Sequence, residues 1–173
     1  MAKTTFSGPV YSKNGFINTG PGNTISLTAD TTLTVATHAG KILLTNDADG
    51  KFTLPTINVT ADSGVAGPGP ALDSLNNIGA SFYFYVALAA TDMDILTDGT
   101  DKFVGAIMLA VDDGAKKAFF PAAANDVITM AGSVTGGIVG SVLSITAIDD
   151  DKYLVHDSLV LASGTIVTPF ANA

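Results

Sequence analysis

Apolar and polar residues alternate over several short segments of the chain. In residues 25–27, and again in residues 33–35, an apolar side chain stands at every second position with Ser or Thr between. Such alternation allows one face of a strand to be buried while the other faces water. Residues 81–88 instead place aromatic and β-branched side chains on both faces, which predicts a strand in the centre of a sheet.

Further short apolar segments follow, separated by Gly, Asn and Asp. They predict strands at residues 41–45, 51–54, 93–96, 103–109, 118–120, 127–130, 138–148, 153–156 and 159–161. We expect residues 46–50 to form a hairpin connection between the first two. Glu, Gln and Arg, which favour helices, are absent. The sequence therefore predicts an all-β fold, either an antiparallel sandwich or a barrel.

Two segments do not fit a regular strand pattern. Residues 1–23 combine Gly-Pro and Asn-Gly breakers with spaced aromatic residues, which predicts an extended N-terminal arm that docks on a neighbouring surface. Packing of this arm on its own domain is the alternative. We expect residues 24–173 to form a single β domain, with a long Gly/Pro-rich loop at about 59–78. That loop is either an ordinary surface loop or a projecting contact.

The charge balance excludes one class of partner and suggests another. All 8 basic residues are Lys and all 16 acidic residues are Asp, so the net charge is −8. This balance and the absence of Arg argue against nucleic-acid binding. However, 47% of the residues are hydrophobic and the mean hydropathy is +0.40, which suggests that apolar area is buried between subunits. No apolar run reaches the ~20 residues of a membrane-spanning helix, and the first residues lack a secretion signal, so we expect no membrane partner.

Few residues offer reactive chemistry. The chain has no Cys and only two His, His38 and His156, and Ser133 lacks the G-x-S-x-G context of a catalytic serine. Most Asp residues fall in turn dipeptides such as Asp98-Gly99, which predicts backbone capping. A divalent-cation site that includes residues 149–151 is the open alternative. We expect neither an enzyme nor a bound cofactor.

Three segments resemble small virion proteins of tailed bacteriophages. The first is residues 6–16, F-S-G-P-V-Y-S-K-N-G-F. The second runs from residues 40–44 to the T-L-P strand end at residues 53–55, and the third is the closing stretch at residues 162–170. None is a catalytic signature. The chain departs from the pattern in lacking a tryptophan near residues 152–155.

The resemblance implies a head decoration, or cement, protein. Such a β-rich subunit associates, typically as a homotrimer, on the outside of an icosahedral shell, where it bridges capsomers. The expected partners are the major capsid protein and further copies of the chain, on the virion exterior and, during assembly, in the host cytoplasm. Candidate contact residues are Phe6, Pro9, Tyr11 and Phe16. The alternative is a tail-associated or surface β domain that adheres to host glycans.

Overall fold

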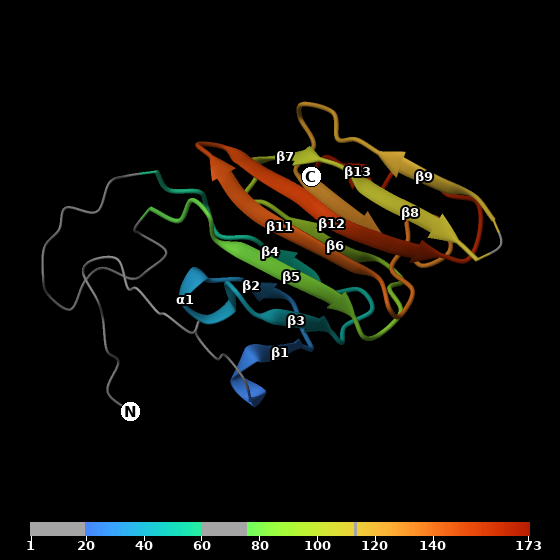
Figure 1. The fold of residues 1–173 in the computed structure, drawn as a ribbon, viewed down its shortest axis with the longest axis horizontal. Coiled ribbons are helices and arrows are strands. Elements are labelled where there is room, and N and C mark those ends of the chain that lie inside the picture. The colour runs from blue at the N-terminus through green and yellow to red at the C-terminus, as the bar shows by residue number, and fades with distance from the viewer. Residues whose placement is uncertain (1–19, 60–75, 113) are drawn as a thin grey trace, which may run out of the picture.

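The computed structural model describes residues 20–59, 76–112 and 114–173. Strands dominate these residues and form two sheets (Figure 1), which confirms the all-β class. The larger sheet contains β1 (Thr24–Leu27), β3 (Ile42–Thr45), β5 (Ser81–Val86), β7 (Lys102–Gly105), β8 (Ile107–Val111), β9 (Lys116–Phe119), β11 (Val142–Asp149) and β12 (Lys152–Ala162). The smaller sheet contains β2 (Thr31–Thr32), β4 (Lys51–Thr53), β6 (Met93–Leu96), β10 (Val127–Met130) and β13 (Phe170–Ala171).

The first half of the chain passes from one sheet to the other after each strand. Strands β1, β3 and β5 belong to the larger sheet, and β2, β4 and β6 to the smaller. Between two strands of one sheet, the chain runs back along a strand of the other sheet. Strands that are neighbours within a sheet therefore run parallel. Thr24 lies opposite Ile42, and Ile42 lies opposite Tyr83. The same crossover between the sheets thus occurs repeatedly, and residues 60–75 belong to the connection from β4 to β5.

The second half of the chain adds antiparallel pairs. β11 lies between β5 and β12 and is antiparallel to both, while β10 is antiparallel to β6 and β13. The sheets are therefore mixed, where the sequence predicted an antiparallel sandwich or a barrel, and no barrel closes among the described strands. The predicted hairpin at residues 46–50 is wrong. Both edges of β3 are occupied by β1 and β5, so the chain crosses to the smaller sheet to form β4.

One hydrophobic core receives side chains from both sheets. Its fully buried members include Leu43, Phe82, Phe103, Ile145 and Tyr153 from the larger sheet, and Phe52, Met93, Ile95, Ile128 and Met130 from the smaller. The Tyr153 hydroxyl donates a hydrogen bond of 2.5 Å to the carbonyl oxygen of Pro55, just beyond β4. This bond links the two sheets through the core.

Two elements differ from the sequence prediction. The strand predicted at residues 33–35 is replaced by a short helix, α1 (Val35–His38). The Thr34 hydroxyl caps this helix by accepting from the Thr37 amide at 3.3 Å, and His38 Nδ1 accepts from the Thr34 amide at 2.9 Å. These local bonds outweigh the alternation of Leu33 and Val35. The short β13, which completes one edge of the smaller sheet, was not predicted.

The predicted arm and the predicted loop lie mostly outside the described residues. Of the arm, only residues 20–23 are described, and Pro21–Asn23 form a 3-10 turn that leads into β1. Of the loop, the two ends are described. The Asn77 amide donates to the Asn58 carbonyl at 2.9 Å, and the Asn58 amide donates to Asn77 Oδ1 at 2.8 Å. The two ends of the inserted segment are therefore held together.

Candidate interaction surface

The outer face of the larger sheet carries a row of apolar side chains, which we call the apolar face: Ile42, Leu44, Tyr83, Tyr85, Val142 and Leu159. It follows from the strand register. Leu44 lies opposite Tyr85, Tyr85 opposite Val142, and Val142 opposite Leu159, so their side chains share one side of the sheet. In Figure 1 the larger sheet lies in front of the smaller, and the view is onto this side.

Members of the apolar face are open to solvent although they are large and hydrophobic. Ile42 is 48% exposed, Tyr83 41% and Leu159 47%. Four adjacent strands, β3, β5, β11 and β12, contribute to it, a width of about 14 Å at the usual strand spacing. Contiguous apolar surface on a folded chain is typical of an interaction site.

The apolar face is also uncharged. On β1, β3 and β5, every residue that points to this side is apolar, Ser, Thr or Tyr. The flanking charges, Lys41, Asp149 and Asp157, stand at strand ends or at a bulge. A chain of net charge −8 thus keeps the outer side of β1, β3 and β5 free of carboxylates. Removing this face from water costs no desolvation of ions.

Beside the apolar face runs a line of polar side chains. Ser81 Oγ lies 2.7 Å from Thr146 Oγ1, which lies 2.9 Å from His156 Nε2. His156 Nδ1 lies 2.8 Å from Asp157 Oδ2. The order hydroxyl, imidazole, carboxylate is that of a hydrolase triad, but Thr146 is in the middle of a regular strand, and none of the hollows described below includes it. These hydrogen-bonded side chains lie along one border of the apolar face.

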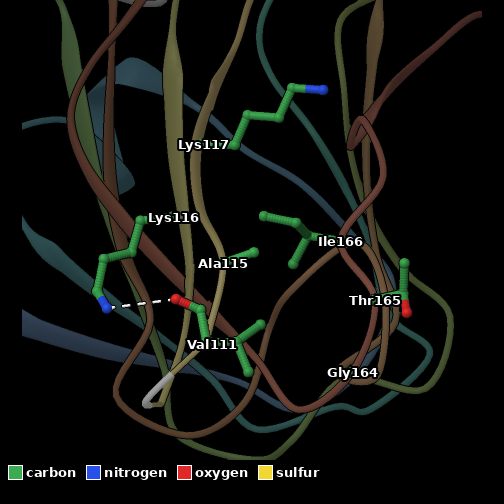
Figure 2. Close-up of a pocket in the computed structure, with 8 residues that line it drawn as sticks. Val111, Ala115, Lys116, Lys117, Gly164, Thr165 and Ile166 are labelled. Carbon is green, nitrogen blue, oxygen red and sulfur yellow. Dashed lines mark hydrogen bonds between the residues drawn. The ribbon is translucent and has the colours of Figure 1, made fainter.

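A first hollow of about 690 Å³ lies between β9 and residues 164–166 (Figure 2). Val111 and Ile166 give it an apolar wall, and Lys116 and Lys117 add two ammonium groups. The Lys117 ammonium lies 4.9 Å from the centre of the Phe119 ring. Neither lysine pairs with a carboxylate in the described parts of the chain.

Two more hollows adjoin each other at the end of the sheets where β11 turns into β12. The Phe120 hollow, about 300 Å³, is lined by Phe103, Val104, Gly105, Phe120 and Pro121, among others. The acidic hollow, about 390 Å³, is lined by Thr56, Ile57, Thr100, Asp101 and residues 149–152. Asp151 and Lys152 line both.

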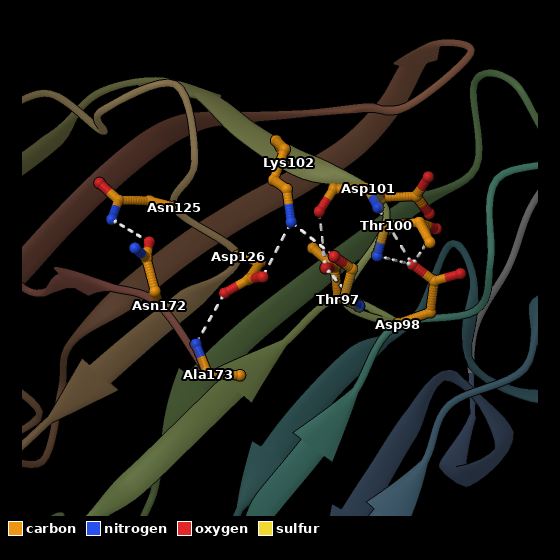
Figure 3. Close-up of polar contacts among 10 residues, drawn as sticks. Thr97, Asp98, Thr100, Asp101, Lys102, Asn125, Asp126, Asn172 and Ala173 are labelled. Carbon is orange, nitrogen blue, oxygen red and sulfur yellow. Dashed lines mark hydrogen bonds and ion pairs between the residues drawn. The ribbon is translucent and has the colours of Figure 1, made fainter.

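The carboxyl groups around the acidic hollow have different roles (Figure 3). Asp98 accepts from the Thr100 amide at 2.9 Å and from its hydroxyl at 2.7 Å, which confirms the predicted turn at Asp98-Gly99. Burial raises the pKa of Asp101, and nearby carboxylates raise it further, although the Ile57 amide donates to it at 2.9 Å. Lys102 Nζ lies 2.8 Å from Asp126 Oδ2.

The structure brings together only some of the residues singled out in the sequence. Phe6, Pro9, Tyr11 and Phe16 lie outside the described residues. His38 is buried in α1 and His156 lies on β12, so they are on different elements. Residues 149–151 adjoin Asp101, but no group of three or more metal-ligating side chains is positioned for an ion within residues 20–59, 76–112 and 114–173.

Sequence reasoning missed the apolar face and Phe120. It interpreted the aromatic residues of 81–88 as covered on both sides, but β5 is interior within its sheet and open on its outer face. It placed Phe120 inside a strand, whereas β9 ends at Phe119 and Phe120 is 72% exposed. The Pro that follows Phe120 was the available signal, because proline ends strand pairing.

No family model matches the chain, and no curated protein and no solved structure shows significant similarity to it. Among the described helices, none is both long and apolar enough to cross a membrane.

Proposed function

We propose that the chain is a structural subunit that decorates the outside of a tailed-phage capsid and stabilises the shell by bridging capsomers. The proposed subunit is a two-sheet sandwich with an N-terminal arm over residues 1–23, and it acts as a homotrimer without catalysis or cofactor. Its partners are the major capsid protein and other copies of itself. The observation that carries the proposal is the uncharged apolar face, because an acidic chain with such a face is suited to bury it against a protein shell.

Two further features support this proposal. The opening residues 6–16 resemble those of phage head decoration proteins, as described above. A bound layer on a pressurised shell needs buried area between subunits, since that area is lost when capsomers separate. The apolar face extends over four strands and therefore offers such area without further rearrangement.

The proposal is tested by co-sedimentation with mature heads of the phage that encodes the chain, purified without it. The wild-type chain should sediment with the heads and saturate. Tyr83→Asp places a carboxylate in the middle of the apolar face and should weaken binding at least tenfold, because that charge would have to be buried unpaired. Val167→Asp is the matched control, since Val167 is 47% exposed but lies outside the sheets. Equal binding of both variants would refute this use of the face.

A second function, adhesion to host glycans, is favoured by one observation. The Tyr83 ring is exposed on a firm sheet surface beside the Ser81 hydroxyl, and a sugar could stack on it. A glycan array probed with the wild-type chain separates the two functions. Specific hits that Tyr83→Ala abolishes would favour adhesion over decoration.

A further inference from the structure

The Phe120 hollow lies along a sheet edge that no described strand covers. β7 pairs with β12 on one side, and on its other side no described strand pairs with it, although the Phe103 amide donates to the Asn125 carbonyl at 3.0 Å. The hollow lies between β7 and the chain that leaves β9 at Phe120 and Pro121. Phe120 stands on the rim of this hollow with most of its ring in water. An exposed aromatic ring beside a strand edge that has no partner strand is the arrangement that an extended peptide segment can complete.

The adjoining acidic hollow has more carboxylates than cations. Lys152 Nζ lies 2.6 Å from Asp151 and 3.7 Å from Asp149, so both of these are paired. Asp150 is exposed and has no ion pair among the described residues, and Asp101 adds a carboxyl group deeper in the hollow. An occupant of both hollows must therefore offer an apolar group next to a cation.

Residues 1–19 of the chain have the required chemistry. Their only charged side chains are those of Lys3 and Lys13, and they include Phe6, Tyr11 and Phe16. In an extended segment, Tyr11 and Lys13 point to the same side about 7 Å apart. One can enter an apolar hollow while the other faces carboxylates in the hollow beside it. No other stretch of this length in the chain has two lysines and no aspartate.

The position of Gly20 decides how far this segment has to reach. Gly20 precedes β1, and β1 is separated from β12 by β3, β5 and β11, a distance of about 19 Å at the usual strand spacing. Nineteen extended residues span up to about 60 Å. The segment is therefore long enough to pass beyond its own subunit to the next.

We propose that residues 1–19 of one copy dock in the Phe120 hollow and the acidic hollow of a neighbouring copy, with Tyr11 against Phe120 and Lys13 against Asp150. This inference deepens, and rests on, the homotrimer of the proposed function. A cyclic trimer needs two different surfaces that meet head to tail, and the basic segment and the acidic hollow are such a pair. The contact also offsets the repulsion between copies of net charge −8.

The test is a charge exchange between two full-length variants. Lys13→Glu in one chain and Asp150→Lys in another should each weaken self-association about tenfold, because each puts like charges together. Mixed in equal amounts, the two variants should assemble better than either does alone, because two of the three contacts in every mixed trimer then join opposite charges or remain native. The double variant Lys13→Glu/Asp150→Lys, in which all three contacts join opposite charges, should assemble as the wild type does. Sedimentation velocity in low salt measures the assembly. Lys116→Glu and Asp112→Lys carry the same charge changes elsewhere on exposed positions and should assemble normally.

Each other outcome overturns the proposal. A monomeric wild type, or variants that assemble normally, would exclude the contact. Weakening that the double variant restores but that mixing does not improve would place the segment in the hollow of its own chain. Phe120→Ser, which leaves charges untouched, should weaken assembly and should not recover on mixing with Lys13→Glu.

If these tests fail while the wild type still co-sediments with heads, only the inference falls. If assembly recovers but no sample binds heads, only the proposed function falls.

Discussion

Asp101 and Asp126 are two buried carboxyl groups that the fold treats in opposite ways. Burial raises the pKa of Asp101, and its neighbouring carboxylates add to that effect. Burial also acts to raise the pKa of Asp126, but the Lys102 ammonium and the Ala173 amide, which donates to Oδ1 at 2.9 Å, outweigh it and lower the pKa. One group favours folding when protonated, the other when ionised.

Asp126→Asn should destabilise the chain by about 1–2 kcal/mol at pH 7, because hydrogen bonds to a charged group are lost. The lowered pKa means that this stabilisation is present above the unfolded pKa of about 3.9 and is lost as pH falls through the folded value. The deficit should therefore shrink between pH 4 and pH 2. Urea unfolding of both proteins at several pH values measures it.

Asp101→Asn is the control, because its effect on the free energy of unfolding should change with pH in the opposite direction. The side-chain oxygen that accepts from the Ile57 amide is kept, and the raised pKa means that stabilisation by the protonated acid is lost as pH rises through the folded value. Relative to wild type, this variant should gain stability from pH 3 to pH 7. A parallel pH dependence for the two variants would contradict the opposite environments assigned to the two groups.

Gly105 occupies a position that only glycine fits. Its φ is +98°, and a Cβ there would meet the carbonyl oxygen of Val155 on β12. Gly105→Ala should cost about 3 kcal/mol, from the strained φ and from the displaced strand pair. Gly99→Ala is the matched comparison, since Gly99 has a φ of +91° but open space around its Cβ position. It should cost about 1–2 kcal/mol. Thermal unfolding measures both, and equal losses would contradict the close approach of β7 and β12.

β12 is the element on which the larger sheet depends most. It pairs with β11 along its length, with β7 near its start and with β8 near its end. It also carries Tyr153, which is fully buried and whose hydroxyl donates to Pro55. Burial and nearby Asp98 and Asp101 raise the pKa of this phenol, so it remains a donor at any ordinary pH.

Tyr153→Phe should therefore cost about 1–3 kcal/mol, because it leaves the buried Pro55 carbonyl without its donor. Tyr85→Phe removes a hydroxyl from a half-buried ring on the apolar face and should change the free energy of unfolding by less than about 0.5 kcal/mol. Guanidinium unfolding at pH 7 compares them. Equal stability of the Tyr153 variant and wild type would mean that the link between the sheets contributes nothing.

Strand positions were largely predictable from the sequence, but strand partners were not. The apolar alternation and the turn residues predicted most strands to within a few residues, β5 and β6 among them. Alternation states which side of a strand is buried, yet it carries no signal for the neighbouring strand or its direction. The parallel winding of the first half therefore could not be derived, and residues 46–50 were taken for a hairpin. The Thr34 cap of α1 was a readable signal that the apolar alternation obscured.

The candidate surface was predictable only in part. The high hydrophobic content indicated apolar area in excess of the core, for which the sequence predicted burial between subunits, but it gave no position for that area. Its place on β3, β5, β11 and β12 depends on how two sheets share a single core and leave the outer side of β5 open. The run of aromatic residues in 81–88 indicates a covered strand and cannot say whether the cover is the same chain or a partner.

At the level of the whole molecule, charge and apolar surface are separated. Carboxylates gather at turns such as residues 149–151, while the outer face of the larger sheet between β1 and β11 is free of them. Its net charge makes copies of the chain repel one another in general, and the apolar face is the surface best suited to contact another protein. This separation fits the proposed assembly on a capsid better than it fits catalysis, which needs a concave site with converging reactive groups.

An electron-microscopy reconstruction of phage heads that carry the chain tests the proposed role most directly. It should show the chain on the outer surface in clusters of three, with Ile42, Tyr83 and Leu159 turned toward the shell. Heads without density for the chain, or bound chains whose large sheet faces the solvent, would contradict the proposal.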